Sequence, residues 1–301
     1  MNNENSERHL AAGLALAFFG AIAFSGKAII VKLAYRWGVD AVTLLMLRML
    51  FAMPIFAVMA WWAGRGQPAL ARRDWLGVVG LGFTGYYFSS YLDFVGLQYV
   101  TASLERLILY LNPTLVMVLG WLLYGRRIRR LHVAGMAVSY GGILLVLGRE
   151  LSFEGGQVAW GAFLVFASTI TYALYLVYSG QLVLRLGSVR LVGLATTVAC
   201  LCCVAQYLVL RPIDTALAVA PTVVWLSVLN AVLCTALPVL MVMMAIERIG
   251  PTLAAQTGMV GPLSTIMMGV ALLGEPFTPW IAAGTALVIA GIYLFSRGGK
   301  G

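Results

Sequence analysis

The feature that most restricts the fold of this chain is a series of long apolar segments, each about long enough to cross a lipid bilayer. A membrane-spanning helix needs about 20 mostly apolar residues, whereas a membrane β-strand alternates apolar and polar residues over about 10 positions. The apolar segments here are continuous, which favours helices. Only 10% of the 301 residues are charged, against about 25% in soluble domains. A soluble enzyme, a disordered chain and a fibrous protein are thereby excluded.

The segments predict an all-α polytopic membrane protein with ten transmembrane helices. Turn signals that contain Gly, Pro and Arg separate the segments. The expected spans are 10–34, 40–63, 74–97, 101–123, 131–148, 158–180, 190–211, 222–247, 250–273 and 280–296. They divide the chain into a cytoplasmic N-terminal tail (1–9), a first five-helix repeat (10–148), a second five-helix repeat (158–296) and a cytoplasmic C-terminal tail (297–301).

Basic residues in the loops predict the orientation. An even number of spans puts both termini on one side, and loops rich in Lys and Arg stay in the cytoplasm. The loops on the side of the termini carry Arg8, Arg65, Arg72, Arg73, Arg126, Arg127, Arg129, Arg130, Arg185, Arg190, Arg248, Arg297 and Lys300, whereas the opposite loops carry Arg36, Arg149 and Arg211. Both termini are therefore expected in the cytoplasm. The net charge of +9 then reflects topology, and we expect no nucleic-acid partner. We expect the first span to be retained, because Glu4 and Glu7 outweigh Arg8, unlike the basic start of a signal peptide.

The two halves of the sequence repeat each other at an offset of 149 residues. Each half has five spans, an odd number, so the second half would enter the membrane in the opposite sense. Inverted repeats around a shared central site are typical of secondary transporters, although small residues also recur wherever membrane helices pack closely. The matching pairs are Leu104 and Leu253, Pro113 and Pro262, Gly120 and Gly269, Gly125 and Gly274, Gly135 and Gly284, and Gly142 and Gly291.

The sequence resembles the EamA family of the drug/metabolite transporter (DMT) superfamily over nearly its whole length. Lys32 followed by Arg48 resembles the family's Lys…Arg pair in the first two spans, and Leu272-Leu273-Gly274-Glu275-Pro276 resembles its "LGE" motif before the last span. One position departs from the pattern, because Arg126 stands in the first half where Glu275 stands in the second. Other matching positions are the prolines Pro113 and Pro262 and the Gly-x6-Gly pairs Gly135–Gly142 and Gly284–Gly291.

The resemblance implies a fold and an activity. Family members move small organic metabolites across a membrane, and the overall likeness is greatest to bacterial amino-acid exporters of the YddG type. It implies a multi-pass protein of the bacterial inner (plasma) membrane. Its expected partners are a small-molecule substrate and the lipid bilayer. The oligomeric state is left open, and a monomer is compatible with the sequence.

Patterns that resemble catalytic or cofactor motifs lack the context that those motifs need. The GxGxxG of residues 80–85 falls inside a predicted span, and residues 20–28 have the wrong spacing for a P-loop. The four cysteines lie within spans without metal-ligand spacing: Cys200, Cys202, Cys203 and Cys234. We therefore predict a transporter that is not an enzyme, with no cofactor and no metal.

Five charged residues fall inside the predicted spans, each at a cost of about 2.5–3.5 kcal/mol if unpaired. At about 1.5 Å per residue, all five lie in one layer of the outer half of the first repeat. They either lock the first four helices together through salt bridges or line the translocation path as a gate, and both roles are compatible. This outer charge layer consists of Lys27, Arg48, Asp93, Glu105 and Arg106.

Polar and aromatic residues at helical spacing predict a substrate cavity. Prolines free backbone carbonyls, which a membrane tolerates where they line a cavity. Hydroxyls and aromatic rings suit an amphipathic metabolite, although the same residues also hold helices together by hydrogen bonds. The expected cavity residues are Tyr86, Ser89, Ser90, Asn112, Ser168, Tyr172, Tyr175, Thr257 and Ser264, with helix breaks at Pro113 and Pro262.

The sequence thus predicts a secondary transporter that exports small metabolites, above all amino acids, including aromatic and other uncharged ones, by alternating access around a central cavity. An exporter of drugs or phosphorylated sugars is the alternative within the superfamily. A membrane enzyme or a scaffold is the alternative from another class. The driving force is a proton gradient or the substrate gradient itself, and Asp93 and Glu105 are the acids within the spans that could carry a proton.

Overall fold

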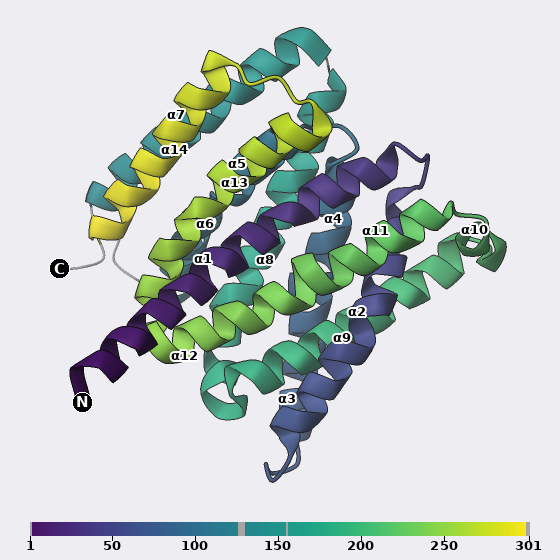
Figure 1. Ribbon diagram of the computed structural model, residues 1–301, viewed down its shortest axis with the longest axis vertical. Helices are drawn as coiled ribbons and strands as arrows, with labels where there is room; N and C mark the ends of the chain where they lie inside the picture. Colours follow the sequence, from purple (N-terminus) through teal and green to yellow (C-terminus); the bar gives the residue numbers. More distant parts are fainter. Residues whose placement is uncertain (1, 126–129, 155, 299–301) are drawn as a thin grey trace.

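The computed structural model describes residues 2–125, 130–154 and 156–298, and all regular structure in these ranges is helical (Figure 1). The α-helices are α1 (Asn2–Tyr35), α2 (Ala41–Gly64), α3 (Arg72–Leu81), α4 (Ser89–Gly96), α5 (Ala102–Leu109), α6 (Asn112–Tyr124), α7 (Arg130–Glu154), α8 (Gly156–Leu186), α9 (Ser188–Leu210), α10 (Ile213–Leu217), α11 (Pro221–Ala231), α12 (Leu237–Thr257), α13 (Gly261–Met268) and α14 (Pro279–Gly298). The predicted loop arginines Arg126, Arg127 and Arg129, and Lys300 of the C-terminal tail, lie outside the described residues.

Several helices are long and apolar enough to span a membrane. Within the described residues there are seven: Leu10–Tyr35, Ala41–Gly64, Ala102–Tyr124, Arg130–Leu151, Gly156–Gly180, Ser188–Leu210 and Pro221–Val242. Two apolar helices are shorter, Gly261–Leu273 and Pro279–Leu294. Large apolar side chains such as Trp62 and Leu184 are exposed on the bundle, as expected for a surface that contacts lipid. The protein is therefore an all-helical, multi-pass membrane protein.

The helices are interrupted inside the bundle as well as at its ends. Short π-helical segments connect α3 to α4 (Gly82–Phe88) and α11 to α12 (Val232–Ala236), and a third follows α13 (Gly269–Leu273). Pro113 and Pro262 each lie in the first turn of a new helix, α6 and α13, where a missing N–H costs no hydrogen bond.

One predicted break lies elsewhere. The spans 222–247 and 250–273 place a break at 247–250, but α12 continues to Thr257 and the break falls at Gly258–Val260, a turn of 3₁₀ helix. A proline inside a helix removes one hydrogen bond, which a helix of 21 residues tolerates here at Pro251. The boundary prediction at this point was therefore wrong.

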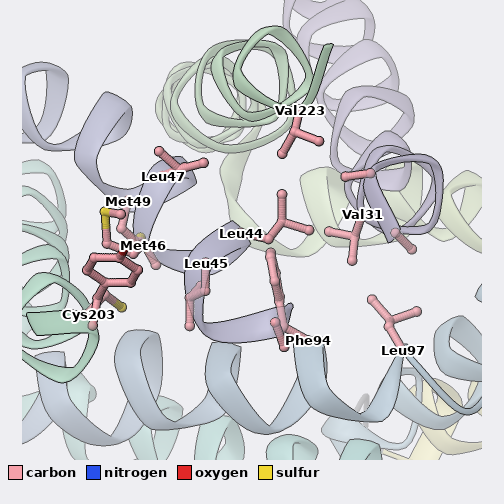
Figure 2. Close-up of a cluster of buried hydrophobic side chains, with 14 of the residues drawn as sticks. Val31, Leu44, Leu45, Met46, Leu47, Met49, Phe94, Leu97, Cys203 and Val223 are labelled. Carbon is pink, nitrogen blue, oxygen red and sulfur yellow. The ribbon is translucent and has the colours of Figure 1, made fainter. Parts of the chain in front are cut away.

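The largest described apolar core lies between α1, α2, α4, α9 and α11 (Figure 2). Val31 of α1 and Leu44 of α2 pack with Phe94 of α4, and each of the three is at most 1% exposed. Cys203 packs in the same core, where it acts as a small apolar side chain. Within a bilayer such contacts stabilise the fold by close van der Waals packing rather than by removal from water.

Helices α7 and α14 pack against each other along one edge of the bundle, through glycines (Figure 1). A Cβ atom on Gly142 would lie 2.7 Å from the carbonyl oxygen of Gly284, and one on Gly291 would lie 2.5 Å from that of Gly135. Ser139 donates a hydrogen bond of 3.4 Å to the carbonyl of Val288 between these two contacts. The absence of side chains at the glycines therefore allows the two backbones to approach closely.

One end of the bundle is called here the Asp40 end, and it holds the connections 36–40, 97–101, 211–220 and 274–278. Asp40 caps α2 there, because its carboxylate accepts hydrogen bonds from the backbone N–H groups of Val42 and Thr43 at 3.0 and 3.2 Å. Arg211, at the end of α9, contacts the same carboxylate at 3.4 Å. A cavity of about 720 Å³ opens among the connections at this end.

Candidate substrate cavity

A cavity of about 340 Å³ lies within the bundle and is lined by residues of α1, α2, α4, α5, α6, α8, α9 and α12 and of two π-helical segments. Its volume is near the lower end of the range for small-molecule sites, about 300–1,000 Å³. The lining comprises Phe24, Lys27, Arg48, Met49, Phe56, Gly85, Tyr86, Ser89, Ser90, Asp93, Arg106, Leu109, Tyr110, Asn112, Ser168, Tyr172, Thr196, Thr235, Val239 and Val242. Apolar walls with a few converging polar groups are typical of ligand sites.

The charged residues lie toward the Asp40 end of the cavity. Counted along the helices at about 1.5 Å per residue, Lys27, Arg48 and Asp93 lie about 5–12 Å from that end. Asn112 and Tyr172 lie about 15–24 Å from it by the same measure. The cavity is therefore charged at one end and aromatic and polar further in.

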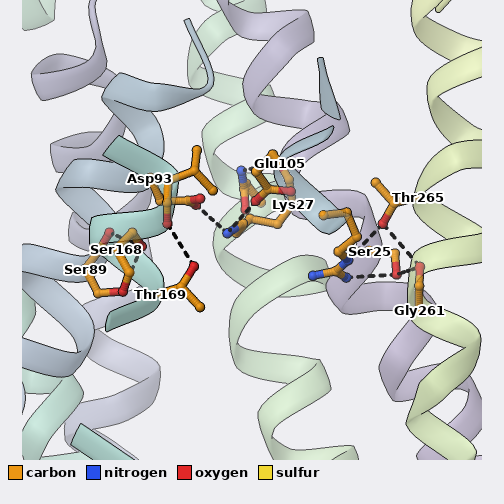
Figure 3. Close-up of polar contacts among 12 residues, drawn as sticks. Ser25, Lys27, Ser89, Asp93, Glu105, Ser168, Thr169, Gly261 and Thr265 are labelled. Carbon is orange, nitrogen blue, oxygen red and sulfur yellow. Dashed lines mark hydrogen bonds and ion pairs between the residues drawn. The ribbon is translucent and has the colours of Figure 1, made fainter. Parts of the chain in front are cut away.

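Lys27 of α1 connects two buried acids (Figure 3). Its ammonium lies 2.5 Å from Asp93 Oδ2 and 3.4 Å from Glu105 Oε1. The side chains of Asp93 and Glu105 are 3% and 0% exposed, so both carboxylates are largely removed from bulk solvent. Three helices, α1, α4 and α5, meet at this cluster.

The two cavity arginines reach across to α13 and to the π-helical segment before α12. Arg48 Nε donates a hydrogen bond of 3.0 Å to Thr235 Oγ1. Arg106 donates to Thr265 Oγ1 at 3.0 Å and to Ser25 Oγ at 2.9 Å, and Ser25 donates in turn to the carbonyl of Gly261 at 2.8 Å (Figure 3). These bonds connect the first part of the chain to the last across the cavity.

Tyrosines and serines form the wall away from the charges. The rings of Tyr86 and Tyr175 meet edge to face with centroids 5.0 Å apart, and their hydroxyls lie 3.3 Å apart. Tyr172 stacks on Tyr175 with centroids 5.5 Å apart. Ser89 and Ser168 exchange hydrogen bonds between α4 and α8 (Figure 3). Gly85 allows Tyr175 to pack against its backbone, because a Cβ atom at position 85 would collide with the ring of Tyr175.

The structure brings most of the predicted site residues to this one cavity. Six of the expected cavity residues and four of the charged residues line it: Tyr86, Ser89, Ser90, Asn112, Ser168 and Tyr172, and Lys27, Arg48, Asp93 and Arg106. Tyr175 lies behind Tyr86, and Glu105 lies behind Lys27. Thr257 and Ser264 are not in the described lining, and Ser264 donates to the carbonyl of Val260 in its own turn of helix.

Three lining hydroxyls, those of Tyr110, Thr196 and Thr235, were missed from the sequence. Thr196 of α9 is followed by Thr197, and Thr235 of the π-helical segment lies in an apolar stretch, so neither belongs to a polar stripe at helical spacing. The signal that was available for Thr235 is its neighbourhood, because Asn230 lies one π-turn earlier and accepts its hydrogen bond at 2.8 Å.

Two of the family-motif residues, Lys32 and Glu275, lie at the Asp40 end, whereas the third, Arg48, lines the cavity. Lys32 donates to the carbonyls of Leu97 and Val100 at 3.2 and 2.8 Å. Glu275 receives three hydrogen bonds at the start of α5, from the backbone N–H groups of Ala102 (2.7 Å) and Ser103 (3.2 Å) and from the Ser103 hydroxyl (2.7 Å). A carboxylate at a helix N-terminus satisfies free N–H groups and complements the helix dipole.

This role gives a physical reason for the departure at Arg126. Positions 251 and 252 correspond to Ala102 and Ser103 at the 149-residue offset, and they lie inside the continuous helix α12. A helix that continues has no free N–H groups to cap, so no acid is needed opposite it. The placement of Arg126 itself lies outside the described residues.

Replacing Glu275 by glutamine should lower the free energy of unfolding by about 1.5–3 kcal/mol, the range for hydrogen bonds to a charged group. Glutamine keeps one acceptor oxygen, but its amide N–H₂ would face an N–H or O–H donor of Ser103. Thermal unfolding of the purified protein measures the effect. Gln98→Ala, at an exposed residue that lines the same cavity of the Asp40 end as Glu275, is the control and should change little. Equal effects of the two substitutions would contradict the capping role.

Known proteins are similar to this sequence over almost its full length. The model of the EamA-like transporter family matches residues 11–148 and again residues 159–297. The protein named "Uncharacterized transporter YcbK" of Bacillus subtilis (strain 168) is 31% identical over 278 residues, which cover 89% of this chain and 87% of that protein. An "Uncharacterized transporter" of Archaeoglobus fulgidus is 22% identical over 291 residues, covering 96% and 97%.

A crystal structure of another protein matches the fold. The TM-score is 0.63 at 20% sequence identity, and the match covers 95% of this chain and 97% of that chain. At this identity the likeness concerns the fold alone. The two family matches together cover more than half of the chain, and the chain belongs to the EamA-like transporter family.

Proposed function

We propose that this EamA-family transporter exports amino acids, including aromatic and other uncharged ones, by alternating access around the 340 Å³ cavity. The observation that carries the proposal is the lining of that cavity, which combines charges of both signs at one end with tyrosines further in. An amino acid is divided in the same way, because its ammonium and carboxylate lie at one end of the molecule and its side chain at the other. Tyrosine rings suit apolar and aromatic side chains, and their hydroxyls suit polar ones.

The proposal includes ten transmembrane helices in two inverted five-helix repeats. Reciprocal contacts between α7 and α14 support it. Gly142 meets Gly284, the counterpart of Gly135, and Gly291, the counterpart of Gly142, meets Gly135. Ser139 bonds Val288, its own counterpart at the 149-residue offset. Contacts of this kind arise when a two-fold axis relates the partners, and in antiparallel helices such an axis is perpendicular to them, in the plane of the membrane.

The proposal also places the protein in a bacterial inner membrane with both termini in the cytoplasm, so that the Asp40 end faces outward. Polar contacts join the elements at that end. The guanidinium of Arg36 donates to the carbonyl of Leu273 at 2.5 Å, and Glu275 caps α5. Export would require these contacts to break as the halves rock about the cavity, so they are proposed as the outer gate together with the Lys27 cluster.

Counterflow into proteoliposomes tests the proposal. The purified protein is reconstituted in liposomes loaded with an unlabelled amino acid or phosphorylated sugar. Uptake of labelled phenylalanine, leucine, serine, glutamate and a labelled phosphorylated sugar is measured with and without a pH gradient. We expect exchange of the uncharged amino acids. Exchange of a phosphorylated sugar but of no amino acid would favour the alternative within the superfamily, and exchange of nothing would contradict export of amino acids. A rate that does not change with the pH gradient would assign the driving force to the substrate gradient.

A further inference from the structure

Arg48 has an unused donor at the charged end of the cavity. Its side chain is on α2 and is 5% exposed. Nε bonds Thr235, and the guanidinium lies over the ring of Phe94, 5.2 Å from the centroid. Nη1 is buried and has no hydrogen-bond partner among the described residues. A buried charged donor without a partner is costly, so a partner from outside the protein would relieve that cost.

Asp93 has an unused acceptor on the same cavity. It is 2% exposed, and its Oδ2 holds Lys27, but its Oδ1 has no hydrogen-bond partner among the described residues. Arg48 lies over the ring of Phe94, the residue next to Asp93, yet no ion pair within 4 Å joins Arg48 to any described carboxylate. Opposite charges are thus near each other on one cavity but are not paired.

The other cations of the cavity are already engaged. Lys27 is bound to Asp93 and Glu105, and two nitrogens of Arg106 bind Thr265 and Ser25. Arg48 is thus the cavity cation for which the described structure shows a buried, unpartnered nitrogen. A guanidinium offers parallel N–H donors that match the two oxygens of a carboxylate.

We infer that Arg48 and Asp93 together bind the zwitterionic backbone of a free α-amino acid, with its carboxylate on Arg48 and its ammonium on Asp93 Oδ1. In an α-amino acid these two groups are attached to one carbon atom, so they reach neighbouring partners of opposite charge. The side chain then points toward Tyr86 and Tyr172, further along the same cavity. This assignment rests on the proposed function, since it identifies what that cavity recognises.

The assignment predicts that a ligand must carry both the ammonium and the carboxylate of an α-amino acid to bind tightly. A ligand that lacks one group leaves a buried charged atom unpaired, and sites that bind a substrate polar group reject analogues without it. We expect phenethylamine, which lacks the carboxylate, and 3-phenylpropionate, which lacks the ammonium, to bind about tenfold or more weaker than phenylalanine. The aliphatic series of leucine, isoamylamine and isocaproate should behave in the same way.

Binding of these six probes to the purified full-length protein in lipid nanodiscs tests the assignment. Arg48→Gln should weaken the two amino acids and leave the two amines unchanged, so the preference for a carboxylate disappears. Asp93→Asn should weaken the amino acids and leave the two acids unchanged. Arg65→Gln is the matched control, because Arg65 is an exposed arginine directly after the same helix. It should leave all six affinities as they are.

Several results would overturn the assignment. One is wild-type protein that binds the amines as tightly as the amino acids, or that binds neither amino acid. Another is an Arg48→Gln protein that weakens all probes equally, which is the result expected of a merely structural arginine. If Arg48→Gln does not fold, Arg48→Lys retains the charge without the paired donors and should reduce the same preference. Counterflow with the wild-type protein distinguishes failure of this assignment from failure of the proposed function. A protein that exchanges amino acids but lacks this selectivity would contradict only the binding roles of Arg48 and Asp93.

Discussion

Replacing Lys27 by methionine is expected to lower the free energy of unfolding by about 3–5 kcal/mol, the cost of leaving buried charge without its partner. Methionine has a similar length and no charge. Without the ammonium, Asp93 and Glu105 would face each other at 2% and 0% exposure. Thermal unfolding of the purified protein at neutral pH measures the loss.

Two further variants distinguish charge from packing at this cluster. Lys27→Arg retains the cation and should lose much less stability than Lys27→Met. A triple variant, Lys27→Met with Asp93→Asn and Glu105→Gln, removes all three charges and should recover most of the loss. If Lys27→Met unfolds at the wild-type temperature, the ammonium does not stabilise the two buried acids, which would contradict the role given to this cluster.

Neighbouring glycines on α7 should respond to alanine with opposite signs. Gly142→Ala adds a Cβ atom 2.7 Å from the carbonyl oxygen of Gly284 and 2.9 Å from Leu287 Cβ. Both neighbours are close to the α14 backbone and cannot move independently of it, so we expect a loss of about 1–3 kcal/mol from overpacking. Gly141→Ala meets nothing within 4 Å and should gain up to about 1 kcal/mol from helix propensity.

The comparison is sharp because the two positions are adjacent in one helix. Unfolding temperature in the same detergent gives the sign for each variant. A stabilising effect at both positions would mean that α7 and α14 are not in contact in solution. Equal destabilisation at both would mean that the glycines are required for a property of the helix itself rather than for the interface.

Much of the fold could be predicted from the sequence because helices and their faces follow from local patterns. Continuous apolar runs predict helices, and Pro113 and Pro262 lie where new helices begin. The break between the predicted spans 222–247 and 250–273 was wrong, because α12 continues through it to Thr257. A local pattern shows where a break is allowed, while the packing of the surrounding helices decides whether it occurs.

Less of the site could be predicted, since a pattern shows which residues share a helix face but not what that face meets. The stripe of Tyr86, Ser89 and Ser90 faces the cavity, whereas Ser264, predicted by the same rule, bonds within its own helix. The contact of Glu275 with the start of α5 joins residues more than 170 positions apart. No local pattern encodes such a contact.

The α7–α14 interface also has a consequence for how such a chain can be assembled. Ser139 bonds Val288, its own counterpart in the other half. Gly142 contacts Gly284, the counterpart of Gly135, and Gly135 contacts Gly291, the counterpart of Gly142. Each half therefore carries both contact surfaces of this interface. A half-length chain would therefore present to an identical copy the same complementary face that the two halves of this chain share. Two separate copies of one such unit could dimerise through this interface, and fusing two copies end to end would preserve it.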